Sequence, residues 1–335
     1  MALTPVTVII VNWNSGVLLE KCLARLMDQT LLPARILVMD NGSTDGSPQR
    51  AQLIPGVTVR MLGANTGFAA ANNLALRECE TDIVALLNPD AFPEPDWLLR
   101  LVFAADRNEE VVAFGSRQMS AVSPSVIDGV GDIYHISGRV WRNGGGRTLC
   151  AADHVAREIF SPCAGAALYR RDALVNAGGF DEDYFCYVED IDLGFRLRLA
   201  GYRCLYVPTA VVYHVGSSSS GGQHSDFSVY HGHRNLVWTF VKNMPGALFW
   251  LLLPLHLVLN VGTVLWLTAR RNQGRVVLRA KWDAIKGLPK IWAKRKEIQA
   301  ARAASIGEIW TALDKRSFFF NRLRRHLPRF YGRKG

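Results

Sequence analysis

Residues 6–14 of the chain read VTVIIVNWN, an apolar run that ends in polar side chains at Asn12 and Asn14. A run this rich in β-branched residues, with no basic segment before it, predicts a buried strand and not a signal peptide. A helical pattern follows over residues 16–27, and apolar runs continue to alternate with helical spacings as far as residue 87. This order predicts an α/β fold, with a mostly parallel sheet flanked by helices and ligands at the carboxyl ends of the strands.

The pattern is less regular in the second half of the chain. Residues 111–155 contain many glycines, and we interpret them as a loop-rich or short-stranded excursion. A helix is predicted over residues 191–200 and a strand over residues 203–213. The run Ser217–Gly222 is a flexible stretch that fits a linker or a mobile lid equally well.

Charge is distributed unevenly along the 335 residues, whose formal net charge is +10. Residues 270–335 hold 19 Lys and Arg against 4 Asp and Glu, a net of +15, while residues 1–269 hold 20 against 25, a net of −5. The body has no excess positive charge to attract a polyanion, so we do not expect nucleic acid as a partner. The six cysteines form no CxxC pair and indicate neither a disulfide framework nor a zinc site.

Residues 243–269 contain no Asp, Glu, Lys or Arg. The segment exceeds the ~20 residues that a transmembrane helix needs, but Pro254, His256, Asn260 and Gly262 interrupt it. We therefore favour a monotopic or re-entrant hairpin over a single span, with a buried core helix as the third alternative. The basic and aromatic sequence that follows is typical of segments that meet an anionic membrane surface.

Polar clusters follow three of the predicted strands. Asp40 and Asn41 come after the second strand, where a carboxylate can accept hydrogen bonds from a nucleobase or a ribose. Residues 65–73 form a further strand-to-helix turn that carries several amides, and Asn88 and Asp90 follow the next apolar run. Carboxylate oxygens suit hard divalent cations, which often share them with phosphates. Ordinary turns and helix caps produce the same residue types, so no single cluster is decisive.

Carboxylates gather between residues 178 and 193, in the sequences Phe180-Asp181-Glu182 and Glu189-Asp190. A helix begins here, and part of the acidity suits the positive end of a helix dipole. His214 ends a later strand, and a lone histidine is more often structural than a ligand. The ordered set of motifs carries more information than any one of them.

Taken together and in this order, the motifs resemble family 2 glycosyltransferases of the GT-A fold, and most of all their bacterial rhamnosyltransferase-like branch. The resemblance covers roughly residues 5–245. It implies a GT-A catalytic domain over residues 1–240, followed by an apolar segment and a basic, helical, membrane-associating tail over residues 241–335. Binding of a nucleotide sugar is implied for Asn12, Asn14, Asp40, Asn41, Asn65, Gly67, Asn72, Asn88 and Asp90.

The resemblance also implies roles at the reacting centre. Asp190 matches the catalytic base, with Glu189 beside it, and Asp90 and His214 match ligands of a divalent metal, Mg²⁺ or Mn²⁺. Acceptor binding is expected at Phe180, Asp181 and Glu182. Asn88 stands where many members of the family carry Asp, which leaves strict metal dependence open.

The implied reaction is an inverting sugar transfer in which a carboxylate takes the proton of the acceptor hydroxyl. The favoured donor is dTDP-L-rhamnose, with a UDP-hexose as the alternative. The expected acceptor is a polyprenyl-diphosphate-linked saccharide or similar glycolipid of cell-wall or O-antigen synthesis, at the cytoplasmic face of the bacterial inner membrane. A catalytically inactive membrane scaffold is the competing interpretation, and the sequence indicates no oligomeric state.

Overall fold

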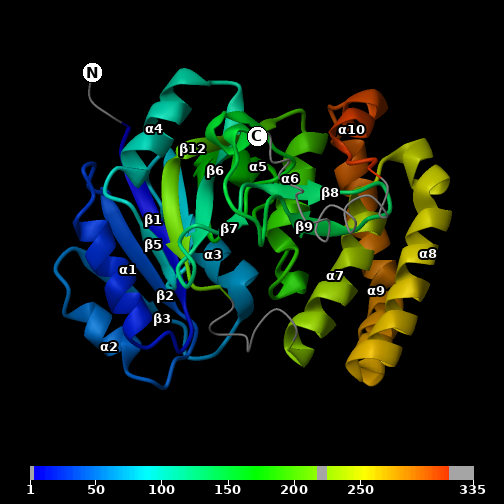
Figure 1. The fold of residues 1–335 in the computed structure, drawn as a ribbon, viewed down its shortest axis with the longest axis horizontal. Helices are drawn as coiled ribbons and strands as arrows, with labels where there is room; N and C mark the ends of the chain where they lie inside the picture. Colours follow the sequence, from blue (N-terminus) through cyan, green and yellow to red (C-terminus); the bar gives the residue numbers. More distant parts are fainter. Residues whose placement is uncertain (1–3, 217–224, 317–335) are drawn as a thin grey trace, which may run out of the picture.

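The computed structural model describes residues 4–216 and 225–316 (Figure 1). In the first quarter of the chain, strands and helices alternate strictly: β1 (Val6–Asn12), α1 (Val17–Met27), β2 (Arg35–Asp40), α2 (Ser47–Gln52), β3 (Val57–Met61), α3 (Gly67–Glu78) and β4 (Ile83–Leu87). β1 pairs in parallel with β2 and β4, and β2 pairs in parallel with β3. The predicted βαβα order is confirmed, and the carboxyl ends of these strands share one edge of the sheet.

The rest of the sheet is mixed. Its further elements are β5 (Ala91–Pro93), α4 (Trp97–Arg107), β6 (Val111–Ser120), β7 (Ile127–Gly129), β10 (Arg157–Glu158), β11 (Ala166–Arg170), α5 (Arg171–Asn176), α6 (Glu189–Leu199) and β12 (Arg203–His214). The strand order is β10-β12-β6-β11-β4-β1-β2-β3. β11 runs antiparallel between β4 and β6, while β12 runs parallel to β6. A separate two-stranded ribbon is made by β8 (Asp132–Tyr134) and β9 (Val140–Arg142).

The interpretation of residues 111–155 as an irregular excursion is wrong at its start. β6 is a ten-residue strand inside the sheet. Its second half contains polar residues, which can be buried in the sheet because they are hydrogen-bonded to residues outside the strand. The Trp97 indole donates to Ser116 Oγ (2.8 Å), and Gln118 donates to the Cys163 carbonyl (3.3 Å). Only the following stretch, with β7 to β9, is short-stranded as predicted.

Helices cover both faces of the sheet. The buried residues of α1, α2 and α4 form one hydrophobic core with one face, and those of α3, α5 and α6 form a second core with the other. A third core joins α6 to the C-terminal helices α7 (Asp226–Asn243), α8 (Gly246–Arg271), α9 (Gly274–Ala300) and α10 (Ile306–Ala312). The C-terminal helices therefore pack against the body of the protein as a further layer (Figure 1).

The apolar segment is one continuous helix, so the expected break into a hairpin is wrong. α8 runs through Pro254 and is long and apolar enough to cross a membrane by length and composition. Two of its polar residues make hydrogen-bond contacts, one outside the helix and one within it: His256 Nδ1 lies 2.8 Å from the Ser137 carbonyl, and Asn260 donates to the His256 carbonyl (2.7 Å). The antiparallel partner of α8 is α9, beyond the turn at Asn272 (Figure 1). The stretch Ser217–Gly222 lies outside the described residues.

Candidate active site

The first part of the site is built where β1 and β2 end side by side. Asn12 and Asp40 are register partners, and both side chains are fully buried. Asn12 donates to Asp40 Oδ1 (2.8 Å), and the backbone N–H of Ser43 donates to Asp40 Oδ2 (3.0 Å). These bonds fix the carboxylate at the strand edge and tie it to the loop that follows.

Three loops at this edge are linked to one another by amide side chains. Asn14 takes a left-handed backbone (φ 49°), and its Oδ1 accepts from the Thr44 N–H (2.8 Å). Asn41 donates to the Gly67 carbonyl (3.1 Å), and Asn65 Oδ1 accepts from the Gly67 N–H (3.0 Å). The predicted nucleotide-sugar residues of β1, β2 and the start of α3 are thus brought together.

Asn72 lies deeper, on α3. Its side chain is buried and donates to the Phe68 carbonyl one turn earlier (2.9 Å). This hydrogen bond joins two residues of α3, and the Asn72 side chain is almost fully buried.

The second part of the site surrounds His214, at the end of β12. His214 Nε2 lies 3.2 Å from Asp90 Oδ1 and 3.4 Å from Asn88 Nδ2, so the two predicted metal ligands are in contact. β5 pairs with β12 and places Ala91 opposite His214, which is how residues 124 positions apart meet. Asp90 and His214 are both buried.

His214 has a further partner that the motifs did not indicate. Its Nδ1 lies 2.9 Å from Asp128 Oδ2, and Asp128 is also paired with Arg142. Burial opposes protonation of the imidazole, but hydrogen bonds to Asp128 and Asp90 outweigh it and raise the pKa of His214. A carboxylate on the second ring nitrogen is the usual way in which proteins orient a metal-binding histidine.

The donor set at Asp90 and His214 fits a divalent cation. One carboxylate oxygen and one imidazole nitrogen converge in a buried site, and the amide of Asn88 adds a neutral group where a second carboxylate would add charge. Carboxylate oxygens suit both Mg²⁺ and Mn²⁺, and imidazole is a ligand of divalent transition metals.

A second set of ligand-type groups lies at the start of α6. Oxygen or sulfur atoms of Asp132, Cys163 and Asp190 lie within 4.8 Å of one another. Burial raises the pKa of the Cys163 thiol, which keeps the sulfur protonated and makes it a poor ligand for a hard cation. Of the two sets, Asp90 and His214 therefore suit a hard divalent cation better, and the second set forms the surroundings of Asp190.

Asp190 occupies the first turn of α6. Its Oδ1 accepts from the Ile191 N–H (2.8 Å) and its Oδ2 from the Ala164 N–H (3.3 Å). Burial raises the pKa of Asp190, and the nearby Arg142 guanidinium offsets part of this effect. The neighbouring Asp132 is buried more deeply than Asp190, and burial together with the charge of Asp190 raises the pKa of Asp132.

Glu189 is less well placed for proton transfer than Asp190. Its side chain is 7% exposed, and burial followed by the charge of Asp190 raises its pKa well above the usual range. Among the described residues, its Oε2 finds no hydrogen-bond partner. Of the two adjacent carboxylates, Asp190 is the one that accepts from the backbone N–H groups of other residues, Ile191 and Ala164.

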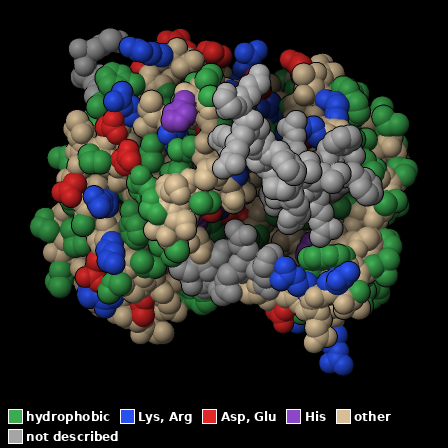
Figure 2. Space-filling model, viewed as in Figure 1, with side chains coloured by type: hydrophobic (Ala, Val, Ile, Leu, Met, Phe, Trp, Pro, Cys, Tyr) green, Lys and Arg blue, Asp and Glu red, His purple; other side chains and the backbone are tan. Residues whose placement is uncertain are grey.

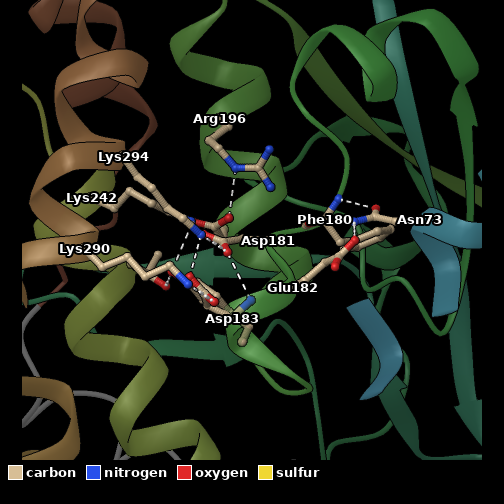
Figure 3. Close-up of polar contacts among 12 residues, drawn as sticks. Asn73, Phe180, Asp181, Glu182, Asp183, Arg196, Lys242, Lys290 and Lys294 are labelled. Carbon is tan, nitrogen blue, oxygen red and sulfur yellow. Dashed lines mark hydrogen bonds and ion pairs between the residues drawn. The ribbon is translucent and has the colours of Figure 1, made fainter. Parts of the chain in front are cut away.

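The three predicted acceptor residues divide into two kinds. Phe180 is buried and packs edge-to-face on Phe68, and Asp181 is ion-paired with Lys242 and Lys294. These contacts favour a supporting role for Phe180 and Asp181 over direct contact with an acceptor. Glu182 is exposed and accepts a hydrogen bond from Asn73 (2.9 Å), as Figure 3 shows.

Sequence reasoning missed Asp128, Asp132 and Arg142, which come from β7, β8 and β9. Arg142 is paired with Asp128 and is close enough to Asp132 and Asp190 for their charges to raise its pKa. It connects the His214 side of the site with the Asp190 side. The available signal was the set of charged residues beside glycines, Asp128-Gly129, Gly131-Asp132 and Arg142-Asn143-Gly144, in a segment interpreted as loop.

The comparisons with known proteins agree with this geometry. The family model described as "Glycosyl transferase family 2" matches residues 7–176. The chain is 34% identical over 242 residues to the N-acetylglucosaminyl-diphospho-decaprenol L-rhamnosyltransferase of Mycobacterium tuberculosis, which covers 64% of this chain and 77% of that protein. It is 28% identical over 197 residues to the rhamnosyltransferase WbbL of Escherichia coli K12, which covers 52% of this chain and 70% of that protein.

Among solved structures, the mannosyltransferase PcManGT from Pyrobaculum calidifontis, in complex with GDP-Man and Mn²⁺, superposes with a TM-score of 0.54. The two share 19% identity, over 93% of this chain and 88% of the other. The fold and the comparisons together define a glycosyltransferase of the GT-A fold. The chain belongs to glycosyl transferase family 2, where it is similar to the rhamnosyltransferase-like members.

Proposed function

We propose that the chain is an inverting rhamnosyltransferase that moves L-rhamnose from dTDP-L-rhamnose to a polyprenyl-diphosphate-linked saccharide. The observation that carries the proposal is the similarity to the mycobacterial L-rhamnosyltransferase, at 34% identity over 242 residues. That protein's name states a lipid-linked acceptor, and an apolar helix borders the catalytic body of this chain. A UDP-hexose is the alternative donor.

Each part of the site has a role in this reaction. The loops that hold Asn14, Asn41 and Asn65 bind the nucleotide, with the buried Asp40 fixing their shape. Asp190 accepts the proton of the acceptor hydroxyl as that oxygen attacks the anomeric carbon, on the side opposite the departing dTDP. When bound at Asp90 and His214, a divalent cation supplies charge neutralisation at the leaving diphosphate.

The surface of α8 supports a membrane-bound acceptor. Its outward side chains include seven large apolar residues with exposed fractions of 45 to 68%: Trp250, Leu251, Leu257, Val258, Val261, Leu265 and Trp266. Hydrophobic side chains accordingly line the edge of the molecule over α8 (Figure 2). The adjoining α9 adds Leu278, Trp282 and Ile285, and we call these ten residues the apolar edge.

We propose that the apolar edge lies in the interfacial layer of the bacterial inner membrane, at its cytoplasmic face. Arg270 and Arg271 follow directly at the end of α8 and suit anionic headgroups. In this arrangement the protein is peripheral or monotopic, with residues 1–240 as the catalytic domain and residues 241–335 as the membrane-associating region. The division is functional only, since α7 and α9 pack in one core with α6.

The test is transfer by the purified chain from a panel of dTDP- and UDP-sugars to a polyprenyl-diphosphate-linked N-acetylglucosamine, with and without Mn²⁺. We expect dTDP-L-rhamnose to be the best donor. Replacing Asp190→Asn should lower turnover by about 10²- to 10⁴-fold, the contribution usual for a general base, while dTDP-rhamnose still binds. Transfer only from UDP-sugars, only to soluble acceptors, or not at all would each contradict a separate part of the proposal.

A further inference from the structure

The segment before Asp190 has an unusual backbone. Phe185, Tyr187 and Val188 all take left-handed conformations, with φ values of 66°, 66° and 70°. This region is unfavourable for large side chains, and most of all for a β-branched residue such as Val188. Such conformations persist only where the surrounding contacts impose them, and they concentrate at functional sites.

The contacts that impose this turn come from α7. Asn235 is fully buried, and the two N–H donors of its amide are shared among three carbonyls: Tyr184 (3.0 Å), Cys186 (3.0 Å) and Tyr187 (2.8 Å). Arg234 donates to Asn235 Oδ1 (2.9 Å), which fixes the direction in which the amide points. Arg234 also donates to the carbonyls of Asp183 and Tyr184 (both 3.0 Å).

Ion pairs from α9 hold the start of the same turn (Figure 3). Lys294 Nζ lies 2.5 Å from Asp181 and 2.7 Å from Asp183, and Lys290 lies 2.6 Å from Asp183. The network continues to the helix that carries the base. Lys242 of α7 bridges Asp181 (2.5 Å) and the buried Asp192 of α6 (2.8 Å).

We propose that Asn235 and Lys294 are positioning residues of the transfer reaction: they hold residues 181–188 in the left-handed turn that points Asp190 at the acceptor hydroxyl. The inference rests on the proposed function. Two helices converge on the stretch directly before the base, from the side opposite the nucleotide loops. Since α9 also contributes to the apolar edge, the same helix both attaches the protein to the membrane and helps to position Asp190.

The experiment uses the full chain and three substitutions on α9. Lys294→Met removes the charge and keeps the length of the side chain, and Lys294→Arg restores a cation. Lys296→Met is the matched control, because Lys296 is exposed and makes no ion pair within residues 4–216 and 225–316. Hydrogen exchange of the 182–188 amides, kcat, the KM for the acceptor, dTDP affinity and the unfolding midpoint are measured for each.

We expect Lys294→Met to speed exchange in residues 182–188 and to lower kcat by about 10- to 100-fold, because misplacement by about 1 Å can cost roughly 10²-fold in rate. The dTDP affinity should change less than kcat, because the turn meets the nucleotide loops at Phe185, beside Gly67, whereas Asp190 follows the turn directly in the chain. Lys294→Arg should recover most of the rate. Lys296→Met should match the wild type. Asn235→Asp replaces the amide donor with a carboxylate that faces three carbonyls. In the folded variant, kcat should again fall more than the dTDP affinity.

The inference is overturned if Lys294→Met leaves exchange and kcat unchanged, or if kcat, dTDP affinity and the unfolding midpoint fall together as in general destabilisation. Failure of the proposed function gives a different result. The wild type then transfers no sugar, while the exchange of residues 182–188 still reports whether Lys294 holds the turn.

Discussion

As the proposed base, Asp190 is the residue whose surroundings should set the pH dependence of transfer. Burial raises its pKa, and Arg142 with the backbone donors partly opposes the rise. A base acts when ionised, so activity should be present above this pKa and lost as the pH falls through it. The acidic limb of kcat/KM should therefore lie above the ordinary range of an aspartate.

Replacing Arg142 should change the pKa of Asp190 in a known direction. The guanidinium stabilises the carboxylate form of Asp190, so Arg142→Met should raise the pKa further and move the acidic limb to higher pH. The measurement is kcat/KM against pH for both proteins. If the acidic limb stays in place or moves to lower pH, Arg142 does not lower the pKa of the base.

Asp128 contacts His214, one of the two proposed metal ligands. Replacing Asp128→Asn weakens the partner that orients the imidazole through Nδ1, while the shape of the side chain is kept. We expect the Mn²⁺ concentration for half-maximal activity to rise by about 10- to 100-fold, the usual effect of losing such a partner. Asp172→Asn, at an exposed carboxylate on α5, is the control. An unchanged metal requirement would argue against His214 as a ligand.

At the scale of elements, the contact between α7 and α9 is close at Gly287. A Cβ added there would lie 2.6 Å from Cζ2 of Trp238, whose indole donates to the Ala284 carbonyl (2.9 Å). Gly287→Ala should therefore lower the free energy of unfolding by about 1–3 kcal/mol, as overpacking does in a tight core.

Gly262→Ala on α8 is the matched control, since an added Cβ there meets no atom within 4 Å. Alanine is the better helix former, so this variant should be neutral or more stable by up to about 1 kcal/mol. Urea unfolding of the three proteins measures both effects. Equal stabilities for the two variants would show that the α7–α9 contact tolerates a methyl group.

Some helices and strands were predicted from the sequence and others were not. β1 to β4 and their helices were predicted, because each is an apolar run or a 3–4 spacing that is visible locally. β6 was missed, because its polar half is satisfied by Trp97 and other partners that are distant in sequence. The continuous course of α8 was missed for a similar reason, since His256 is explained only by its contact with Ser137.

At the scale of the whole molecule, the apolar edge predicts that the protein binds to membranes. The chain should bind vesicles that contain anionic lipid more strongly than zwitterionic vesicles, and part of the binding should survive high salt because the edge is apolar. Replacing Trp250→Gln together with Leu251→Gln should weaken binding by about tenfold or more, given roughly 1.5–3 kcal/mol for each large apolar side chain that is buried.

Leu53→Gln is the control for this experiment, because Leu53 is 82% exposed and follows α2, away from the C-terminal helices (Figure 1). Vesicle flotation at low and high salt measures each variant. Equal flotation of the double variant and the control would place the membrane contact outside the apolar edge.

The sequence by itself determined the parallel half of the sheet and the family, and it predicted the candidate site residues from Asn12 to His214, since these follow from local periodicity and from short motifs at strand ends. Only the tertiary structure decided which side chains meet. In the folded chain, Asp128 contacts His214, and Arg142 lies between the two halves of the site. Asn235 and Lys294 contact the turn before Asp190. These are contacts between residues far apart in sequence. Their geometry depends on the packing of β7 to β9 and of α7 and α9 on the body, and no local pattern in the chain specifies which of these residues pair.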